Sequence, residues 1–179
     1  FTYLSAPGSM LEGGKTIDDY DVFEALQGKC AVLKIEGVKP NTKITRKQLE
    51  DAYAECEPAD ILLVVTGFGR IHDSYTHDYW DMAPHLSKEA ADYLKSLKPR
   101  VVCFDFAEDA GMCMEPDERY KVENNYTHKV LFEDDVLIID YINFAWKISV
   151  NNAEFYALPL RVAVSGKYTY GDVRAIVKF

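Results

Sequence analysis

Three short runs of apolar and largely β-branched residues constrain the fold of this chain more than any other feature of its sequence. They cover residues 61–66 (ILLVVT), 101–105 (VVCFD) and 136–140 (VLIID), and residues 30–35 (CAVLKI) form a similar run. Such runs have almost no polar face, which is typical of strands that are covered on both sides in a parallel sheet. The pattern therefore predicts a buried sheet between layers of other elements.

Helical segments separate these predicted strands. Thr45 begins the first helix, with Gln48 three residues later as the partner of a capping box, and Ser87 caps the second. The predicted helices cover residues 46–55, 88–97 and 128–132. Strands that alternate with helices along a chain indicate an α/β domain.

The C-terminal part has a different order of elements. Two strands are predicted at residues 155–164 and 172–179, with no helix between them. The sheet should therefore be mixed rather than purely parallel, and flanked by helices. Residues 1–20 are rich in Gly and Ser and are predicted to form a loop. No linker or repeat divides the chain, so residues 1–179 are expected to form one domain.

The net charge of −9, from 20 basic and 29 acidic residues, disfavours partners that need a basic face, such as nucleic acid or an anionic membrane. No apolar run approaches the length of about 20 residues that a bilayer span needs. The four cysteines form no C-x-x-C pair, which argues against a zinc ribbon or a redox motif. Reduced thiols of this kind favour a cytoplasmic protein.

Several motifs follow one another in a specific order. Residues 13–18 (GGKTID) form a G-G-x-[ST]-[IV]-[DE] turn, and residues 26–32 (LQGKCAV) share Leu26, Gly28 and Val32 with an L-x-G-x-[AV]-V-[VL] strand. Residues 86–91 (LSKEAA) match the helix start L-[ST]-x-E-A-A, and residues 155–161 (FYALPLR) match F-x-A-L-P-L-[KR]. Together with the V-R-A of residues 173–175, they resemble the cyclase family, the kynurenine-formamidase-like metal-dependent hydrolases.

The resemblance implies a fold and an assembly. Members of the family have a swivelling β/β/α architecture, and the N-terminal strands of the family would be absent from residues 1–179. Members usually assemble as homodimers or homotetramers, so the same is expected here. A small-molecule ligand is the partner that the resemblance implies.

The family motif H-x-G-T-H-x-D-x-P-x-H, which precedes the glycine turn, is altered in this chain. In the family, its histidines and aspartate bind one or two divalent metals, often zinc or manganese, and its last histidine transfers protons. Aligned back from the turn, Tyr3 stands at a ligand His position and Ser5 at the ligand Asp position. Ser9 stands at the position of the catalytic His. Phenol and hydroxyl groups are poor zinc ligands near neutral pH, so these positions are predicted not to bind metal.

The second half of the family site is better preserved. The resemblance places a ligand histidine at His128 and a ligand carboxylate at Asp140, where the family has a glutamate. The two side chains are expected to converge, with Tyr3, Ser5 and Ser9 around the same cleft. Two ligands rarely hold a catalytic zinc, which normally takes three and a water, so metal binding is predicted to be weak or absent.

Two long loops are predicted at residues 67–86 and 106–123, after the carboxyl ends of strands, where ligands bind in open α/β sheets. By resemblance, the aromatic residues of the first loop wall a substrate pocket: Phe68, Tyr79 and Trp80. Core packing is an equally good interpretation of them. The histidines and aspartates of the same loop offer an alternative metal site, although none has the spacing of a known zinc motif.

Two functions remain open from the sequence. The first is a metal-dependent hydrolase of amides or formamides, which the family resemblance implies. The second is a non-catalytic relative that binds a small ligand or has a structural role as an oligomer, which the substituted motif favours. Bound metal would distinguish them.

Overall fold

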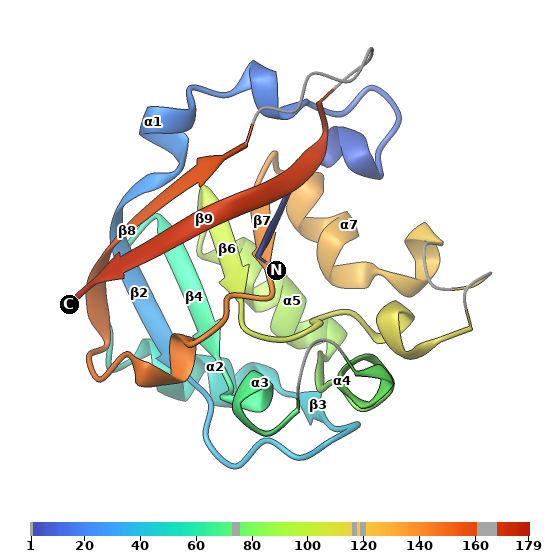
Figure 1. Ribbon diagram of the computed structural model, residues 1–179, viewed down its shortest axis with the longest axis vertical. Helices are drawn as coiled ribbons and strands as arrows, with labels where there is room; N and C mark the ends of the chain where they lie inside the picture. Colours follow the sequence, from blue (N-terminus) through green and yellow to red (C-terminus); the bar gives the residue numbers. More distant parts are fainter. Residues whose placement is uncertain (1, 73–75, 116–117, 119–120, 161–167) are drawn as a thin grey trace.

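The computed structural model describes residues 2–72, 76–115, 118, 121–160 and 168–179. Seven strands form a closed barrel in the order β1-β7-β6-β4-β2-β8-β9 (Figure 1). Their bounds are Tyr3–Ser5 (β1), Gln27–Lys34 (β2), Ile61–Val65 (β4), Val101–Phe104 (β6), Leu137–Asp140 (β7), Asn152–Pro159 (β8) and Tyr170–Lys178 (β9). A separate pair of parallel two-residue strands joins Lys43–Ile44 (β3) to His85–Leu86 (β5).

The barrel is mixed, as the sequence predicts. Strands β2, β4, β6 and β7 are parallel neighbours, and they coincide with the four apolar runs. The remaining pairs are antiparallel: β2 with β8, β8 with β9, β9 with β1, and β1 with β7. The parallel strands place their carboxyl ends at one edge of the barrel, and the predicted long loops leave from that edge.

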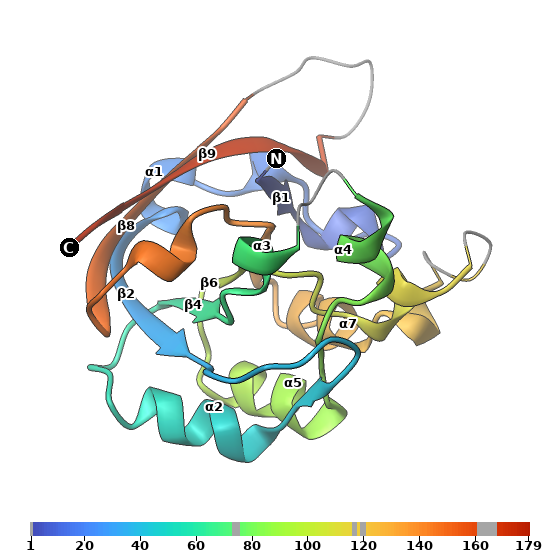
Figure 2. The ribbon, with the colours of Figure 1, turned by 60° about the horizontal axis from the view of Figure 1, so that its bottom comes forward.

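Three longer helices cover one side of the barrel, and β8, β9 and β1 lie on the opposite side (Figure 2). The covering helices are Arg46–Tyr53 (α2), Lys88–Ser96 (α5) and Tyr126–Phe132 (α7). Short helices occupy the connections: Val22–Ala25 (α1), Phe68–Ile71 (α3) and His77–Asp81 (α4). Single 3-10 turns occur at Pro7–Ser9 (η1), Ile17–Asp19 (η2), Ala110–Cys113 (η3), Val122–Asn124 (η4) and Ala145–Lys147 (η5).

Alternation along the strands creates two separate cores. Within β6, Val102 and Phe104 face the helices, whereas Val101 and Cys103 face the barrel interior. The same alternation occurs in the other parallel strands, and this explains why these runs have no polar face. The helix-side core also contains Leu94 of α5 and neighbouring buried residues of α2 and α7.

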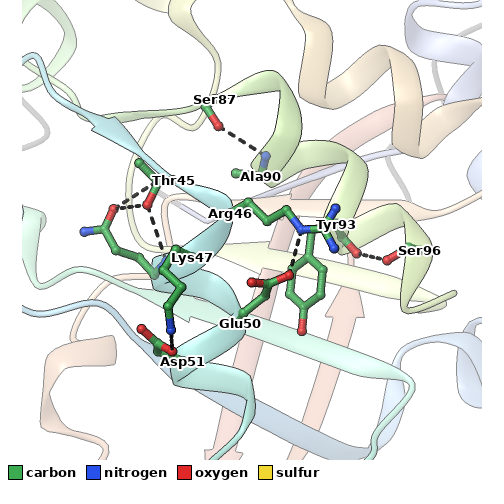
Figure 3. Close-up of polar contacts among 10 residues, drawn as sticks. Thr45, Arg46, Lys47, Glu50, Asp51, Ser87, Ala90, Tyr93 and Ser96 are labelled. Atoms are coloured by element: carbon green, nitrogen blue, oxygen red, sulfur yellow. Dashed lines mark hydrogen bonds and ion pairs between the residues drawn. The ribbon is translucent and has the colours of Figure 1, made fainter.

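The caps of α2 and α5 follow the sequence signals closely (Figure 3). Thr45 and Gln48 form the predicted capping box of α2, and the Ser87 hydroxyl accepts a hydrogen bond from the amide of Ala90 at 3.2 Å in α5. Arg46 in the first turn of α2 pairs with Glu50 at 2.7 Å and lies over the ring of Tyr93 in α5. These contacts fix the start of each helix and hold the two helices together.

Some predicted boundaries were wrong. Residues 1–20 are not simply loop, because β1 inserts between β7 and β9 and closes the barrel. The loop predicted at 67–86 contains α3, α4 and β5, and the loop at 106–123 contains η3 and part of η4. Their short and irregular segments leave no periodic hydrophobic pattern. The strand predicted at 155–164 is β8, which ends at Pro159, and residues 161–164 lie outside the described residues.

Among the described residues, no helix is long and apolar enough to cross a membrane.

Candidate metal centre

Three side chains of the kinds that bind metals meet where β6 and β7 end and α7 begins. Asp140 is the last residue of β7, His128 lies in the first turn of α7, and Glu108 lies four residues beyond β6. One ligand atom from each lies within 4.8 Å of the others. Glu108 and Asp140 are 0% and 1% exposed, so water does not screen their charges. The structure thus adds a third group to the two that the sequence singles out.

The neighbouring carboxylate of Asp109 holds the start of α7. Its Oδ1 accepts the amide hydrogen of Thr127 at 2.8 Å, and its Oδ2 accepts that of His128 at 3.0 Å. These are two of the amide groups that a helix N-terminus leaves without an internal partner. The same Oδ2 lies 2.9 Å from Nδ1 of the His128 ring, within hydrogen-bond geometry. Nε2 of His128 lies 3.8 Å from Oδ2 of Asp140.

Glu108 is held differently from Asp109. Its Oε1 lies 2.8 Å from Nδ1 of His128, but only Asp109 meets the geometry of a hydrogen bond to that nitrogen. Among the described residues, no donor bonds to either carboxylate oxygen of Glu108 or to Oδ1 of Asp140. Buried carboxylate oxygens normally have hydrogen-bond donors or a cation as partners. In the described part of the chain, Oε2 of Glu108 and Oδ1 of Asp140 have no such donor, and Oε1 of Glu108 has only the nearby His128 ring, so these oxygens are suited to a cation.

The clustered side chains shift one another's pKa values strongly. Burial raises the pKa of Asp140 well above its usual range, and the adjacent Glu108 raises it further, although His128 opposes the change. Burial lowers the pKa of His128, but the carboxylates of Glu108, Asp109 and Asp140 outweigh burial and hold it well above its usual range. Without a cation, the cluster therefore tends to keep protons that reduce its negative charge.

Two of the substituted motif positions lie beside this cluster. Antiparallel pairing places Tyr3 opposite Asp140 and Ser5 opposite Ile138. Directly opposite residues share one face of a sheet, and Ile138 faces the helix-side core. Tyr3 and Ser5 therefore occupy the same face as Asp140, and Ser5 is buried.

Ser9 has a different environment. It is exposed in η1, and its hydroxyl donates to the carbonyl of Ala6 at 2.7 Å. No described contact joins it to the three clustered side chains. Its neighbours Met10 and Leu11 pack against the helix-side core, so this segment turns towards the side of the barrel that carries the cluster.

The predicted aromatic residues gather next to the cluster. Phe68 and Tyr79 are buried in the helix-side core, with ring centroids 5.5 Å apart. Trp80 is half-buried and meets the ring of Tyr141 edge-on at 5.0 Å. Tyr141 directly follows Asp140 and has a positive φ of 60°. Phe68 and Tyr79 thus serve core packing, whereas Trp80 and Tyr141 present ring surface at the edge of the core.

A fourth buried acid, Asp105, has a structural role. Its carboxylate accepts hydrogen bonds at 2.8 Å from the amide and hydroxyl of Thr66 and from the amide of Gly67. It therefore ties the carboxyl end of β6 to that of β4. Burial raises its pKa to about 6, although these hydrogen bonds act in the opposite direction.

The raised pKa of Asp105 predicts a pH dependence of stability. The folded state binds this proton more tightly than the unfolded state, so the contribution to stability is present below pH 3.8 and is lost as pH rises through about 6. Relative to Asp105→Asn, the wild-type free energy of unfolding should fall by at most about 3 kcal/mol across this window. Urea unfolding of both proteins across the window measures the difference. Parallel pH profiles would contradict the assignment.

Sequence reasoning missed Glu108 and Asp109 because they lie inside the predicted loop 106–123. Two consecutive carboxylates shortly after a buried strand, at the edge where ligands bind, were the available signal. The alternative metal site in residues 67–86 is not seen, because the group of Glu108, His128 and Asp140 is the one cluster of this kind among the described residues.

Comparisons with known proteins identify a family profile and a shared fold. The profile of the family named Cyclase matches residues 2–108. No curated protein sequence matches the chain. An isatin hydrolase bound to the product analogue thioisatinate has a TM-score of 0.77 and 18% identity, covering 98% of this chain and 70% of that one.

Two further solved structures align with the same share of this chain, 98%. Isatin hydrolase A from Labrenzia aggregata, bound to benzyl benzoate, has a TM-score of 0.74 and 17% identity over 98% of this chain and 71% of its own. A potential metal-dependent hydrolase with cyclase activity has a TM-score of 0.69 and 23% identity over 98% and 76%. At these identities, the likeness shows a shared fold.

Proposed function

Because the match over residues 2–108 shows that this chain belongs to the cyclase family, we propose that it is a metal-dependent hydrolase of small aromatic amides. The observation that carries the proposal is the convergence of Glu108, His128 and Asp140 with three buried carboxylate oxygens that have no described donor. Three protein ligands and an open position are the usual composition of a catalytic zinc site.

The residues present fit a divalent cation. Two carboxylates and one imidazole suit zinc or manganese, the metals that the family resemblance implies. The cation would also offset the repulsion between Glu108 and Asp140, which raises the pKa of Asp140. Nε2 is the nitrogen of His128 that is available as a ligand, because Nδ1 is bonded to Asp109.

When bound, such a cation would lower the pKa of a coordinated water and polarise the carbonyl of an amide. The residues of the chain orient and enclose the reactants. Glu108 and Asp140 supply negative charge from a buried position, and Asp109 fixes the ring of His128. The half-buried ring of Tyr141, which directly follows Asp140 in sequence, meets the ring of Trp80, and the two offer apolar surface to a planar ligand.

Two observations support small aromatic amides as the substrate class. The first is the aromatic surface beside the cluster. The second is that two of the similar structures are isatin hydrolases, which makes isatin, a cyclic aryl amide, a rational test substrate together with an aryl formamide.

A second function is favoured by a separate observation. Tyr3, Ser5 and Ser9 occupy motif positions where the family has two metal ligands and a proton-transfer histidine, and Ser9 has no described contact with the cluster. A chain with these substitutions could bind a small aromatic ligand without turning it over. This non-catalytic function does not require a cation.

Metal analysis and kinetics test the proposed function. After incubation with zinc or manganese and removal of excess metal, we expect about one ion per chain, because the cluster provides one set of three ligands. Hydrolysis of isatin or of an aryl formamide should depend on that ion and disappear with a chelator. A chain that retains no metal and binds the aromatic compound unchanged would support the non-catalytic function instead.

A further inference from the structure

We infer that Asp109 is a positioning residue that fixes the imidazole of His128 so that Nε2 faces Asp140. This inference deepens the proposed function and rests on it for the role of the cation. Asp109 directs both of its oxygens to His128 and the start of α7, where they accept hydrogen bonds.

The geometry restrains His128 at two points. Oδ2 of Asp109 accepts the backbone amide hydrogen of His128 at 3.0 Å and lies 2.9 Å from its ring Nδ1. One oxygen thus contacts both the backbone amide and the ring of His128, which restricts rotation about both side-chain torsions of this residue. The other oxygen accepts from the amide of Thr127 and prevents the carboxylate from turning away.

This restraint selects the nitrogen that is offered to a cation. A ring whose Nδ1–H donates to a carboxylate turns Nε2 to its far side, where Asp140 lies at 3.8 Å and where a cation would replace the proton on that nitrogen. Asp109 is 3% exposed, so water competes little for this hydrogen bond, and the negative charge of the acceptor strengthens it. Carboxylates that hold metal-binding histidines in this way typically contribute 10–100-fold, roughly, to metal affinity.

The adjacent acids therefore have different tasks. Glu108 has no described hydrogen-bond donor and faces the cluster, whereas Asp109 has three donors and faces the helix N-terminus. Asp105 provides a matched control. It is also a buried carboxylate beyond β6 that accepts three hydrogen bonds, but its donors belong to Thr66 and Gly67 rather than to His128.

NMR of the metal-free protein tests the positioning directly. We expect a downfield, slowly exchanging ring proton bonded to Nδ1, assigned to His128 by its loss in His128→Gln. It should move upfield and exchange faster in Asp109→Ala, where Glu108 at 2.8 Å is the remaining acceptor, and it should be unchanged in Asp105→Asn. Absence of this resonance in the wild-type protein would overturn the inference, whether or not any Asp109 variant folds.

Zinc affinity, measured by competition with a chromophoric chelator, provides the second measurement. Asp109→Asn should weaken zinc binding by about 10–100-fold, and Asp105→Asn should leave it close to the wild-type value. Equal affinity in Asp109→Asn and wild type would overturn the inference. If the wild-type protein shows the Nδ1 proton but binds no zinc, the proposed function fails while the orientation of His128 stands.

Discussion

Glu108→Gln should weaken zinc binding by more than about 100-fold. This loss is larger than the one expected for Asp109, because Asp109 positions a ligand whereas Glu108 is itself a ligand. The substitution replaces a charged oxygen donor with a neutral amide of almost the same shape. Asp140→Asn should have a similar effect, since Asp140 contributes the second carboxylate of the cluster. The chelator competition used for Asp109 measures both variants.

In the metal-free protein, Glu108→Gln should raise the free energy of unfolding. Glu108 is buried and raises the pKa of Asp140, and it pairs with the His128 ring only while that ring is protonated, so its charge destabilises the fold at high pH when no cation is present. Metal-free Glu108→Gln should therefore unfold at a higher urea concentration than wild type, most clearly at high pH. The reason is that the wild type loses stability as pH rises through the raised pKa of Asp140.

Glu36→Gln is the control, because Glu36 is exposed and lies outside the cluster. It should change neither zinc affinity nor the urea midpoint. If Glu108→Gln retains full zinc affinity, Glu108 is not a ligand, and the cluster reduces to the two groups that the sequence singled out.

Tyr3→His/Ser5→Asp should tighten zinc binding by at least about tenfold, which corresponds to 1.4 kcal/mol. Tyr3 is paired with Asp140 across β1 and β7, and Ser5 lies two residues along the same face. An imidazole and a carboxylate at these positions add ligands of the kind that the family motif has there. Little turnover should accompany the gain, because no proton-transfer group has been introduced.

Adding Ser9→His to this pair should then raise turnover of an aryl formamide by about 10²–10⁴-fold, the usual contribution of a general base. The segment that carries Ser9 packs through Met10 and Leu11 on the side of the barrel that holds the cluster. Metal content and hydrolysis rate of the single, double and triple variants decide the outcome. Full activity in Tyr3→His alone, or a triple variant that binds no metal, would show that the motif positions do not have these roles.

The elements that the sequence predicted correctly share a local cause. Strands β4, β6 and β7 are apolar on both faces because two cores cover them, and this pattern is visible in any window of five residues. The helices α2 and α5 begin at the predicted residues because their capping side chains lie next to them in sequence. The mixed α/β fold flanked by helices was therefore predictable.

The features that were missed depend on contacts between distant parts of the chain. The strand β1 has only three residues and is specified by pairing with β7 and β9. Glu108 and His128 lie 20 residues apart and meet because the segment after β6 is hydrogen-bonded through Asp109 to the start of α7. The spacing of His128 and Asp140 was recognised through the family resemblance, whereas no pattern linked either residue to Glu108.

Closure of the barrel has a kinetic consequence. Residues 3–5 pair with residues 138–140 and 170–172, so the ring of strands joins segments from opposite ends of the chain. Contacts of such long sequence separation form slowly, because the entropy of a large loop is lost before the pairing is gained. During synthesis, β1 can pair with β7 first, but its pairing with β9 must wait until β9 has emerged. Until then, the barrel remains open between β1 and β9, although Glu108, His128 and Asp140 have all been synthesised by that point.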